Sequence, residues 1–169
     1  MNISLFKRLA LATLLAGTVF IASAALKVGE VFPDLATFKL EGKLPEALKG
    51  KIVMVDFWAS WCGPCKESFP AMNELQKKYG GQGLVIIAIN EDEEKSDMQA
   101  FLKDNAAAFA VVRDAKQTLV AKAGIQTMPS SFMIDQTGAV RFIHSGFHGA
   151  ETRKQYEQEI ESLLKKIAL

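Results

Sequence analysis

The two cysteines of the chain lie two residues apart, in the segment Trp61-Cys62-Gly63-Pro64-Cys65. An apolar run from Ile52 to Trp58 comes shortly before this segment and has the composition of a buried strand. Two thiols at this spacing can close a disulfide and reopen it, so they can exchange two electrons with a disulfide of another protein. The segment therefore predicts thiol–disulfide exchange.

Two other roles are open to a Cys-x-x-Cys pair: an inert structural disulfide and half of a zinc site. A tetrahedral zinc site needs four ligands, and the sequence has no second cysteine pair. A structural bridge in an oxidising compartment usually closes a longer loop. Redox chemistry is therefore the better interpretation.

The pattern gives the two cysteines different tasks. A helix is predicted from Cys62 to Tyr79, which places Cys62 at the helix N-terminus, where free N–H groups and the helix dipole lower the pKa of a thiol. Cys62 is then the nucleophile that attacks a client disulfide. Cys65, one turn further along and more buried, resolves the mixed disulfide. Pro64 suits the first turn, because no N–H donor is needed there.

Asp56 is the only charged residue in the apolar run and precedes Cys62 by six positions. A buried carboxylate has a raised pKa and can take the proton that Cys65 loses when it resolves the mixed disulfide. The alternative is a solvated carboxylate at a strand edge. We expect a buried position and a catalytic role for Asp56.

Strands that alternate with helices and end in a hairpin and a final helix indicate a three-layer α/β/α sandwich around a mixed sheet. The continuous apolar run from Leu84 to Ile89 is typical of a strand buried on both faces. We expect Gly80-Gly81 and Gly124 to end helices, and Ser96 to cap one. The other predicted strands are 36–40, 52–58, 110–112, 131–134 and 139–144, with a turn at 41–43; the predicted helices are 62–79, 96–104, 115–123 and one from about 150, with a short helical piece at 45–49.

Residues 1–24 have the pattern of a signal peptide. Lys7 and Arg8 precede the uncharged apolar run 9–22, and Ala22-Ser23-Ala24 has the small-residue pattern of a cleavage site. The run is short for a membrane span, which needs about 20 residues. An uncleaved anchor is the alternative. We therefore expect export, cleavage without stable membrane insertion, and one mature domain at 25–169.

Net charge indicates neither a nucleic-acid partner nor a membrane partner. Of the 20 basic residues two precede Ala25, so the expected mature chain has 18 basic and 19 acidic residues. This balance gives no electrostatic reason to bind nucleic acid or an anionic membrane.

The segment from Asp56 to Lys66 resembles the active-site segment of the thioredoxin superfamily at every residue except Ser60. Met128-Pro129 matches the position of the family's cis-proline, and Gly146 matches the glycine that ends its last strand. The stretches 31–35, 41–43 and 89–92 are similar to the exported TlpA/ResA-like branch. The resemblance implies a thioredoxin fold with an N-terminal extension over essentially the whole mature chain.

The resemblance also implies a client-binding surface around the cysteines. The family places the backbone of Met128 where it can hydrogen-bond an extended client segment, and Pro129 where a metal ion would approach the thiols. Trp61 is expected to form an apolar shelf, with ordinary surface packing as the alternative. No cofactor or metal is implied beyond the redox-active disulfide. The implied substrate-binding residues are Trp61, Gly63, Pro64, Met128 and Pro129.

The sequence departs from the TlpA/ResA-like pattern at two positions. Those chains usually have Asn at the position of Asp56, and Glu three residues after the second cysteine, where this chain has Ser68. Glu67 is adjacent, but one helical position turns a side chain by about 100° and directs it to solvent. The proton role of that Glu is therefore assigned to Asp56, as in cytosolic thioredoxins.

The combined prediction is an exported thiol–disulfide oxidoreductase of the periplasm that works as a protein-disulfide reductase. Cys-Gly-Pro-Cys resembles the reducing members of the family. A reductant in an oxidising compartment must be re-reduced, and the resemblance implies a membrane thiol reductant of the DsbD/CcdA type. The expected clients are envelope proteins with disulfides, including apocytochrome c.

Two other functions are kept as alternatives. The branch shares an N-terminal stretch with peroxiredoxins, which suggests a thiol peroxidase, but the Thr and Arg that such enzymes use are not beside Cys62. A copper-binding or delivery module would combine the cysteines with His144 or His148, although these two do not form a helical pair. The acidic run from Glu91 to Glu94 is predicted to be a solvated cluster at a helix start.

Overall fold

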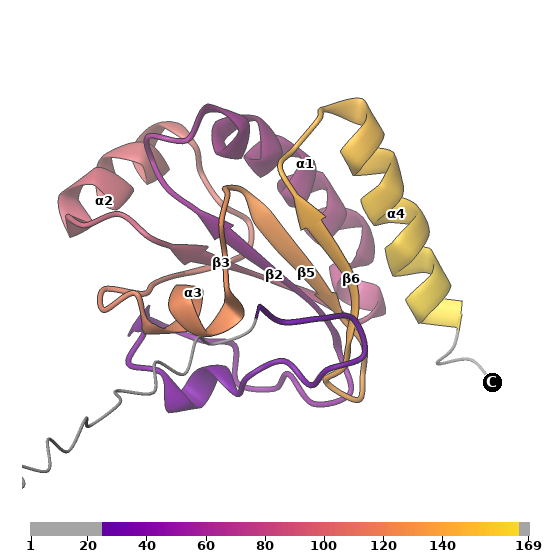
Figure 1. Ribbon diagram of the computed structural model, residues 1–169. Coiled ribbons are helices and arrows are strands. Elements are labelled where there is room, and N and C mark those ends of the chain that lie inside the picture. The colour runs from indigo at the N-terminus through magenta and orange to yellow at the C-terminus, as the bar shows by residue number, and fades with distance from the viewer. Residues whose placement is uncertain (1–24, 166–169) are drawn as a thin grey trace, which may run out of the picture.

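The computed structural model describes residues 25–165. The predicted signal peptide at 1–24 lies outside these residues, as do the last four residues of the predicted domain. Within the described range the chain forms one mixed sheet with helices on both faces, which confirms the predicted three-layer thioredoxin-like architecture (Figure 1).

The sheet has six strands in the order β1-β4-β3-β2-β5-β6. β2, β3 and β4 run parallel, whereas β5 is antiparallel to β2, β6 is antiparallel to β5, and β1 is antiparallel to β4. The central position of β2 matters for function, because the active-site segment follows directly from its carboxyl end. The strands are β1 Glu41–Gly42, β2 Ile52–Trp58, β3 Leu84–Asn90, β4 Ala110–Arg113, β5 Ser130–Ile134 and β6 Val140–Ser145.

Helices cover the two faces unequally. α1, α2 and α4 lie on one face, and α3, the 3-10 turn η1 and the N-terminal segment lie on the other (Figure 1). Among the described residues, no helix is both long enough and apolar enough to cross a membrane. The helices are α1 Gly63–Tyr79, α2 Lys95–Asp104, α3 Thr118–Ala123 and α4 Ala150–Lys165, and the 3-10 turns are η1 Leu35–Thr37 and η2 Gly80–Gln82.

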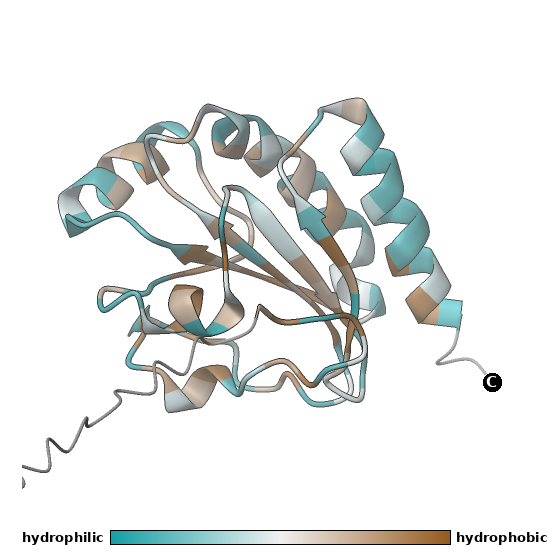
Figure 2. Ribbon diagram, viewed as in Figure 1, coloured by the Kyte–Doolittle hydropathy of each residue, from teal (hydrophilic) through white to brown (hydrophobic). Residues whose placement is uncertain are grey.

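Side chains of β2 alternate between two apolar clusters, as the period of a strand requires. Ile52, Met54 and Trp58 pack in the cluster beneath α1, which also contains both cysteines, and Val53 packs in the cluster beneath α3. Figure 2 shows the result: brown, apolar residues gather in the sheet, and α4 is largely teal on its outer side. Asp56 is in phase with the first three residues and therefore lies on the α1 face.

The N-terminal extension is tied to the sheet edge by backbone hydrogen bonds. Gly29 donates to Val140 at 2.8 Å, Val140 donates to Glu30 at 2.8 Å, and Phe32 donates to Gly138 at 2.9 Å. The buried side chain of Phe32 packs edge-on against Phe132 of β5, with 5.3 Å between the ring centroids. The extension thus closes the cluster beneath α3.

Three local predictions near the N-terminus are wrong. No strand forms at 36–40, where η1 lies instead, capped by the side chain of Asp34. No helix forms at 45–49. The expected turn at 41–43 contains β1, which pairs with Val112 and Arg113 at the far edge of the sheet. The local cap from Asp34 favours η1 over a strand, whereas pairing with the distant strand β4 turns part of the expected turn into β1.

Helix ends also differ in detail from the predictions. α2 begins at Lys95, with no side-chain cap from Glu94, so Ser96 is not the cap. α3 begins three residues later than predicted, because the carboxylate of Asp114 accepts the N–H groups of Thr118, Leu119 and Val120. α1 does end at Tyr79 with Gly80 as its C-cap, as predicted, but a 3-10 turn follows directly and the left-handed residue is Gly83. Gly124 does end α3, at φ +70°.

Candidate active site

Cys62 and Cys65 lie at the start of α1 and are joined by a disulfide. Cys62 is the N-cap residue of the helix, and its sulfur accepts a hydrogen bond from the backbone N–H of Cys65 at 3.2 Å. Cys62 is 5% exposed and Cys65 is fully buried. The outer sulfur therefore belongs to Cys62, but it is more covered than the sequence suggested.

The residues around the disulfide form an open surface. Trp61 is 74% exposed, although it is a large apolar side chain. Gly63 and Pro64 are exposed as well. All three are thus open to solvent beside Cys62 in the sequence.

The Met128–Pro129 peptide bond is cis, as predicted. Met128 is half-buried and packs against the apolar cluster that contains both cysteines. The carbonyl of Pro129 accepts a hydrogen bond from the N–H of Gly146 at 2.7 Å, which links the loop before β5 to the end of β6. The fold thus anchors this loop on the side of the sheet where the cysteines lie.

Ser68 occupies the position where the related branch carries Glu. Its side chain is 1% exposed, and its hydroxyl donates to the carbonyl of Cys65 at 2.8 Å. Glu67 is exposed, as predicted. Neither residue supplies a buried carboxylate beside Cys65.

Asp56 is fully buried in the middle of the sheet. It stands directly opposite Ser131 in the β2–β5 register, and the Ser131 hydroxyl donates to its Oδ1 at 2.5 Å. Burial raises the pKa of Asp56 strongly and the Ser131 hydrogen bond lowers it in part, which leaves a pKa of about 7. The predicted buried position is confirmed, and a group with this pKa can exchange a proton near neutral pH.

Asp92 lies beside the active-site loop, and the prediction that it is solvated is wrong. It is 4% exposed, so it is not a solvated residue at a helix start. Its carboxylate accepts hydrogen bonds from the backbone N–H of Ser60, at 3.0 Å, and from the Ser60 hydroxyl, at 3.0 Å. The Asn90 side chain donates to the same carboxylate at 2.8 Å. Its position just after a buried parallel strand was the available signal, since functional side chains gather at the carboxyl ends of such strands.

Glu91 is also buried, at 5% exposure, which corrects the prediction of a solvated run for its first two residues. Its backbone N–H donates to the carbonyl of Trp58 at 2.9 Å. Burial raises the pKa of the Glu91 carboxyl, the nearby Asp114 raises it further, and Arg113 lowers it in part, which leaves a pKa of about 9. Glu91 is therefore a neutral acid at pH 7. Glu93 and Glu94 are exposed, as predicted.

The partners of the two histidines are residues other than the cysteines. The Nε2 atom of His144 is 2.8 Å from a carboxylate oxygen of Glu159, and its ring packs edge-on against Tyr156. The backbone N–H of His148 donates to the Thr152 hydroxyl at 3.0 Å. Between residues 25 and 165, no group of three or more His, Cys, Asp or Glu side chains is arranged to hold a metal ion.

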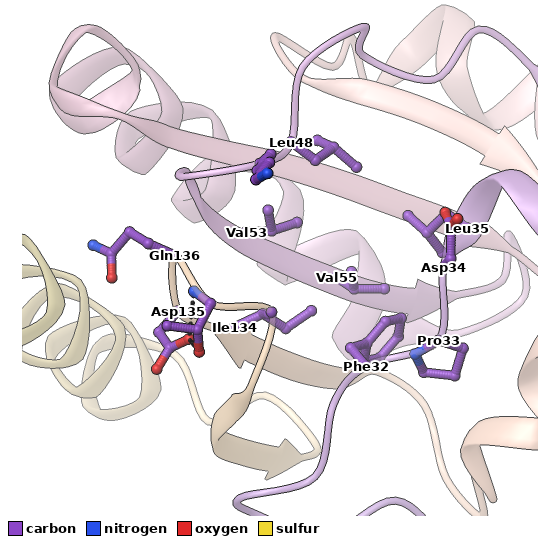
Figure 3. Close-up of a pocket in the computed structure, with 13 residues that line it drawn as sticks. Phe32, Pro33, Asp34, Leu35, Leu48, Val53, Val55, Ile134, Asp135 and Gln136 are labelled. Carbon is purple, nitrogen blue, oxygen red and sulfur yellow. Dashed lines mark hydrogen bonds between the residues drawn. The ribbon is translucent and has the colours of Figure 1, made fainter.

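A cavity of about 210 Å³ lies on the opposite face of the sheet (Figure 3). Val53 and Val55 form its floor, Phe32 closes one side, and the turn at 135–138 closes another. These valines belong to the cluster beneath α3, whereas both cysteines belong to the cluster beneath α1. The cavity is therefore not part of the disulfide site.

A thioredoxin-like sheet whose central strand leads into a helix capped by a Cys-x-x-Cys pair defines a class of proteins, the thiol–disulfide oxidoreductases. The chain belongs to the AhpC/TSA family, whose profile matches residues 28–143.

Individual relatives agree with this class. Thiol-disulfide oxidoreductase ResA of Bacillus thuringiensis (strain Al Hakam) is 36% identical over 144 residues, which cover 84% of this chain and 79% of ResA. The thioredoxin-like protein YneN of Bacillus subtilis is 34% identical over 142 residues, with 80% of each chain covered. A crystal structure from Chlorobium tepidum, provisionally named thiol:disulfide interchange protein DsbE, superposes with a TM-score of 0.76 at 39% identity and covers 83% of this chain and 99% of that one. The chain is thus a thiol–disulfide oxidoreductase.

Proposed function

We propose that this protein is exported and acts as a reductant of client protein disulfides through the Cys62–Cys65 dithiol. The observation that carries the proposal is the arrangement of three groups on one face of the sheet: an N-cap cysteine, a fully buried partner cysteine, and the buried carboxyl of Asp56. These are a nucleophile, a resolving thiol and a proton acceptor.

The reaction begins when the Cys62 thiolate attacks a client disulfide. A bond forms between the Cys62 sulfur and one client sulfur, and the other client sulfur leaves as a thiolate. Cys65 then loses its proton, attacks the Cys62 sulfur, and releases the second client thiolate. The client gains two electrons, and the protein ends with the Cys62–Cys65 disulfide.

The proton of Cys65 goes to Asp56 in this scheme. Cys65 is fully buried, so no bulk water reaches its thiol directly. Asp56 lies on the face of β2 toward α1, and its pKa of about 7 makes its two protonation states close in free energy at neutral pH. Its proton passes to the departing client thiolate when the product leaves.

Client recognition is assigned to Trp61, Gly63 and Pro64 together with the loop at Met128-Pro129. The first three are exposed around Cys62, and the exposed indole of Trp61 offers a large apolar contact area to a client. An extended client segment can then pair with the backbone of Met128. This surface selects unfolded or locally extended clients.

The direction of electron flow and the location are inferred from sequence. Cys-Gly-Pro-Cys is similar to reducing members of the superfamily, and residues 1–24 have the pattern of an export signal. A reductant in the periplasm needs a membrane thiol reductant of the DsbD/CcdA type to restore its dithiol. Proteins with oxidised cysteine pairs, including apocytochrome c, are the proposed clients.

Reduction of insulin by dithiothreitol, with catalytic amounts of the protein, tests the proposed activity. The wild type should accelerate insulin precipitation, and Cys62→Ser should abolish the acceleration. Peroxide consumption by the reduced protein and copper retention after purification are measured in parallel. Peroxide turnover without insulin reduction would replace the proposal by a thiol peroxidase, and stoichiometric copper would replace it by a copper-binding module.

The client class is tested by a trap. A Cys65→Ser variant, produced with its native N-terminal segment, should accumulate mixed disulfides on Cys62 in the periplasm, because resolution is blocked. Mass spectrometry identifies the trapped proteins, and the Cys62→Ser, Cys65→Ser double variant is the control. An absence of trapped protein would contradict the client role.

A further inference from the structure

Three buried side chains from three different elements form one hydrogen-bonded line to the proposed proton acceptor. The hydroxyl of Tyr156, on α4, lies 2.8 Å from the hydroxyl of Ser131, on β5, which lies 2.5 Å from Oδ1 of Asp56, on β2. Tyr156 and Asp56 are fully buried, and Ser131 is 1% exposed. The three side chains depend on one another, because a buried polar group that loses its hydrogen-bond partner costs free energy of folding.

The number of hydrogens fixes the direction of this line. A serine hydroxyl has one hydrogen, and Ser131 donates it to Asp56. Tyr156 must therefore donate to Ser131, and its own hydrogen is available for this, because burial and then the nearby Asp56 raise its pKa above the ordinary value. The line runs from Tyr156 through Ser131 to Asp56.

The two carboxylate oxygens of Asp56 consequently differ. Oδ1 is occupied by the Ser131 hydroxyl, whereas Oδ2 is buried and has no hydrogen-bond partner within residues 25–165. A proton that binds to Oδ2 leaves these hydrogen bonds unchanged. A proton on Oδ1 would instead require the Ser131 hydroxyl to turn its hydrogen away from Asp56. Proton exchange at Oδ2 therefore needs no rearrangement of neighbouring groups.

We propose that Ser131 and Tyr156 are positioning residues for Asp56, which hold its Oδ1 so that Oδ2 is the atom that takes the proton of Cys65. The inference rests on the proposed function, because it assumes that Asp56 is the acceptor. Ser131 acts directly on the carboxyl group, and Tyr156 acts only through Ser131.

Other ionisable groups also lie on the elements that pack against this line. Cys62 and Cys65 lie on the α1 side. His144, on β6, is opposite Ser131 in the β5–β6 register and packs against the Tyr156 ring, with its Nε2 at 2.8 Å from Glu159. His144 is thus the ionisable side chain packed on the far end of this line, and the experiment must separate it from Asp56.

Stopped-flow reaction of the reduced protein with dithiobis(nitrobenzoate) separates the two chemical steps. The first coloured thiolate is released when Cys62 attacks, and the second is released when Cys65 resolves the adduct. The rate of the second phase is measured between pH 5 and 9, a range on the order of two pH units either side of neutrality. The wild type should show an inflection near the pKa of Asp56, about 7.

Ser131→Ala removes the donor that favours the charged form of Asp56, so the inflection should move upward by on the order of one pH unit. Tyr156→Phe keeps the ring and removes only the hydroxyl, and it should produce a smaller upward shift. In the double variant, Tyr156→Phe should add nothing, because its effect passes through Ser131. The first phase should keep its wild-type rate in all three.

Tyr79→Phe is the matched control for loss of a hydrogen-bonded tyrosine hydroxyl, since the residue Tyr79 is 2% exposed in the same cluster and its hydroxyl donates to Glu161. It should leave both phases and the inflection unchanged, and so should His144→Gln. A wild-type inflection in both Ser131→Ala and Tyr156→Phe would overturn the positioning role. If Asp56→Asn itself kept the inflection, the proposed acceptor role of Asp56 would fail, which is a separate result.

Discussion

Asp92 ties the end of β3 to the loop that carries Cys62, because its carboxylate accepts hydrogen bonds from both the backbone N–H and the hydroxyl of Ser60. The Asn90 side chain donates to the same carboxylate. The active-site loop is therefore supported from the neighbouring strand, as well as from the helix that it begins. A carboxylate that accepts three hydrogen bonds is a point where one substitution has a large effect.

Asp92→Ala should lower the free energy of unfolding by about 1–3 kcal/mol, because it leaves the buried Asn90 amide and the partly buried donors of Ser60 without this acceptor. Urea unfolding of the oxidised protein measures the change. Glu93→Ala is the control, since Glu93 is the next residue and is exposed. Equal stability of the two variants would show that the Asp92 carboxylate does not support the loop.

Asp56→Asn should stabilise the oxidised protein at alkaline pH. The pKa of Asp56 rises from 3.8 to about 7 on folding, so the folded state holds its proton where the unfolded state has lost it. The contribution of Asp56 to the free energy of unfolding of the wild type is fully present below the unfolded-state pKa. It is lost as pH rises through the folded-state pKa. Asn does not titrate, so the variant should gain about 2–4 kcal/mol at pH 8 and little near pH 4.

Asp135→Asn is the control in the same unfolding experiments, because its expected change in the free energy of unfolding at pH 8 has the opposite sign. Partial burial works to raise the pKa of Asp135, but hydrogen bonds from Thr137 and Ala139 and the charge of Arg141 outweigh it and lower the pKa. This carboxylate stabilises the fold above its unfolded pKa, so Asp135→Asn should be less stable than wild type at pH 8. A gain at pH 8 in both variants would contradict the assignment for Asp56.

The two cysteines should react at different rates with iodoacetamide when each is studied alone. Cys62, in Cys65→Ser, has an N–H donor at its sulfur and lies at a helix N-terminus, so at pH 6.5 it should react roughly tenfold faster than an unperturbed cysteine. Cys65, in Cys62→Ser, is fully buried and should react more slowly than that reference.

Mass spectrometry of quenched samples follows this alkylation, and the same reaction in urea is the control, where the difference should vanish. Equal rates in the folded protein would show that the helix start does not activate Cys62.

Trp61→Ala should change client reduction without changing stability. Trp61 is 74% exposed, so its removal should alter the free energy of unfolding by less than about 0.5 kcal/mol. Insulin reduction should slow several-fold, while the first phase with dithiobis(nitrobenzoate) stays at the wild-type rate. Trp61→Phe, which keeps an aromatic surface, should recover part of the activity. Unchanged insulin reduction in Trp61→Ala would mean that the indole does not contact the client.

The sequence by itself determined the parts of this protein that depend on residues close together in the chain. A continuous apolar run defines β2, its single acidic residue marks Asp56, and two cysteines after it define the start of α1 and the chemistry. Strand and helix periods and helix-start rules act over a few residues, so these patterns are readable without a structure.

Only the tertiary structure decided which distant side chains meet. Ser131 reaches Asp56 across 75 positions of sequence, and Asp92 reaches Ser60 across 32. Both contacts depend on which strands are neighbours and on their register, because a shift of one residue would turn each side chain to the opposite face of the sheet. The same long-range pairing placed β1 at the sheet edge and buried the first two acids of a run that is locally typical of solvent-exposed residues.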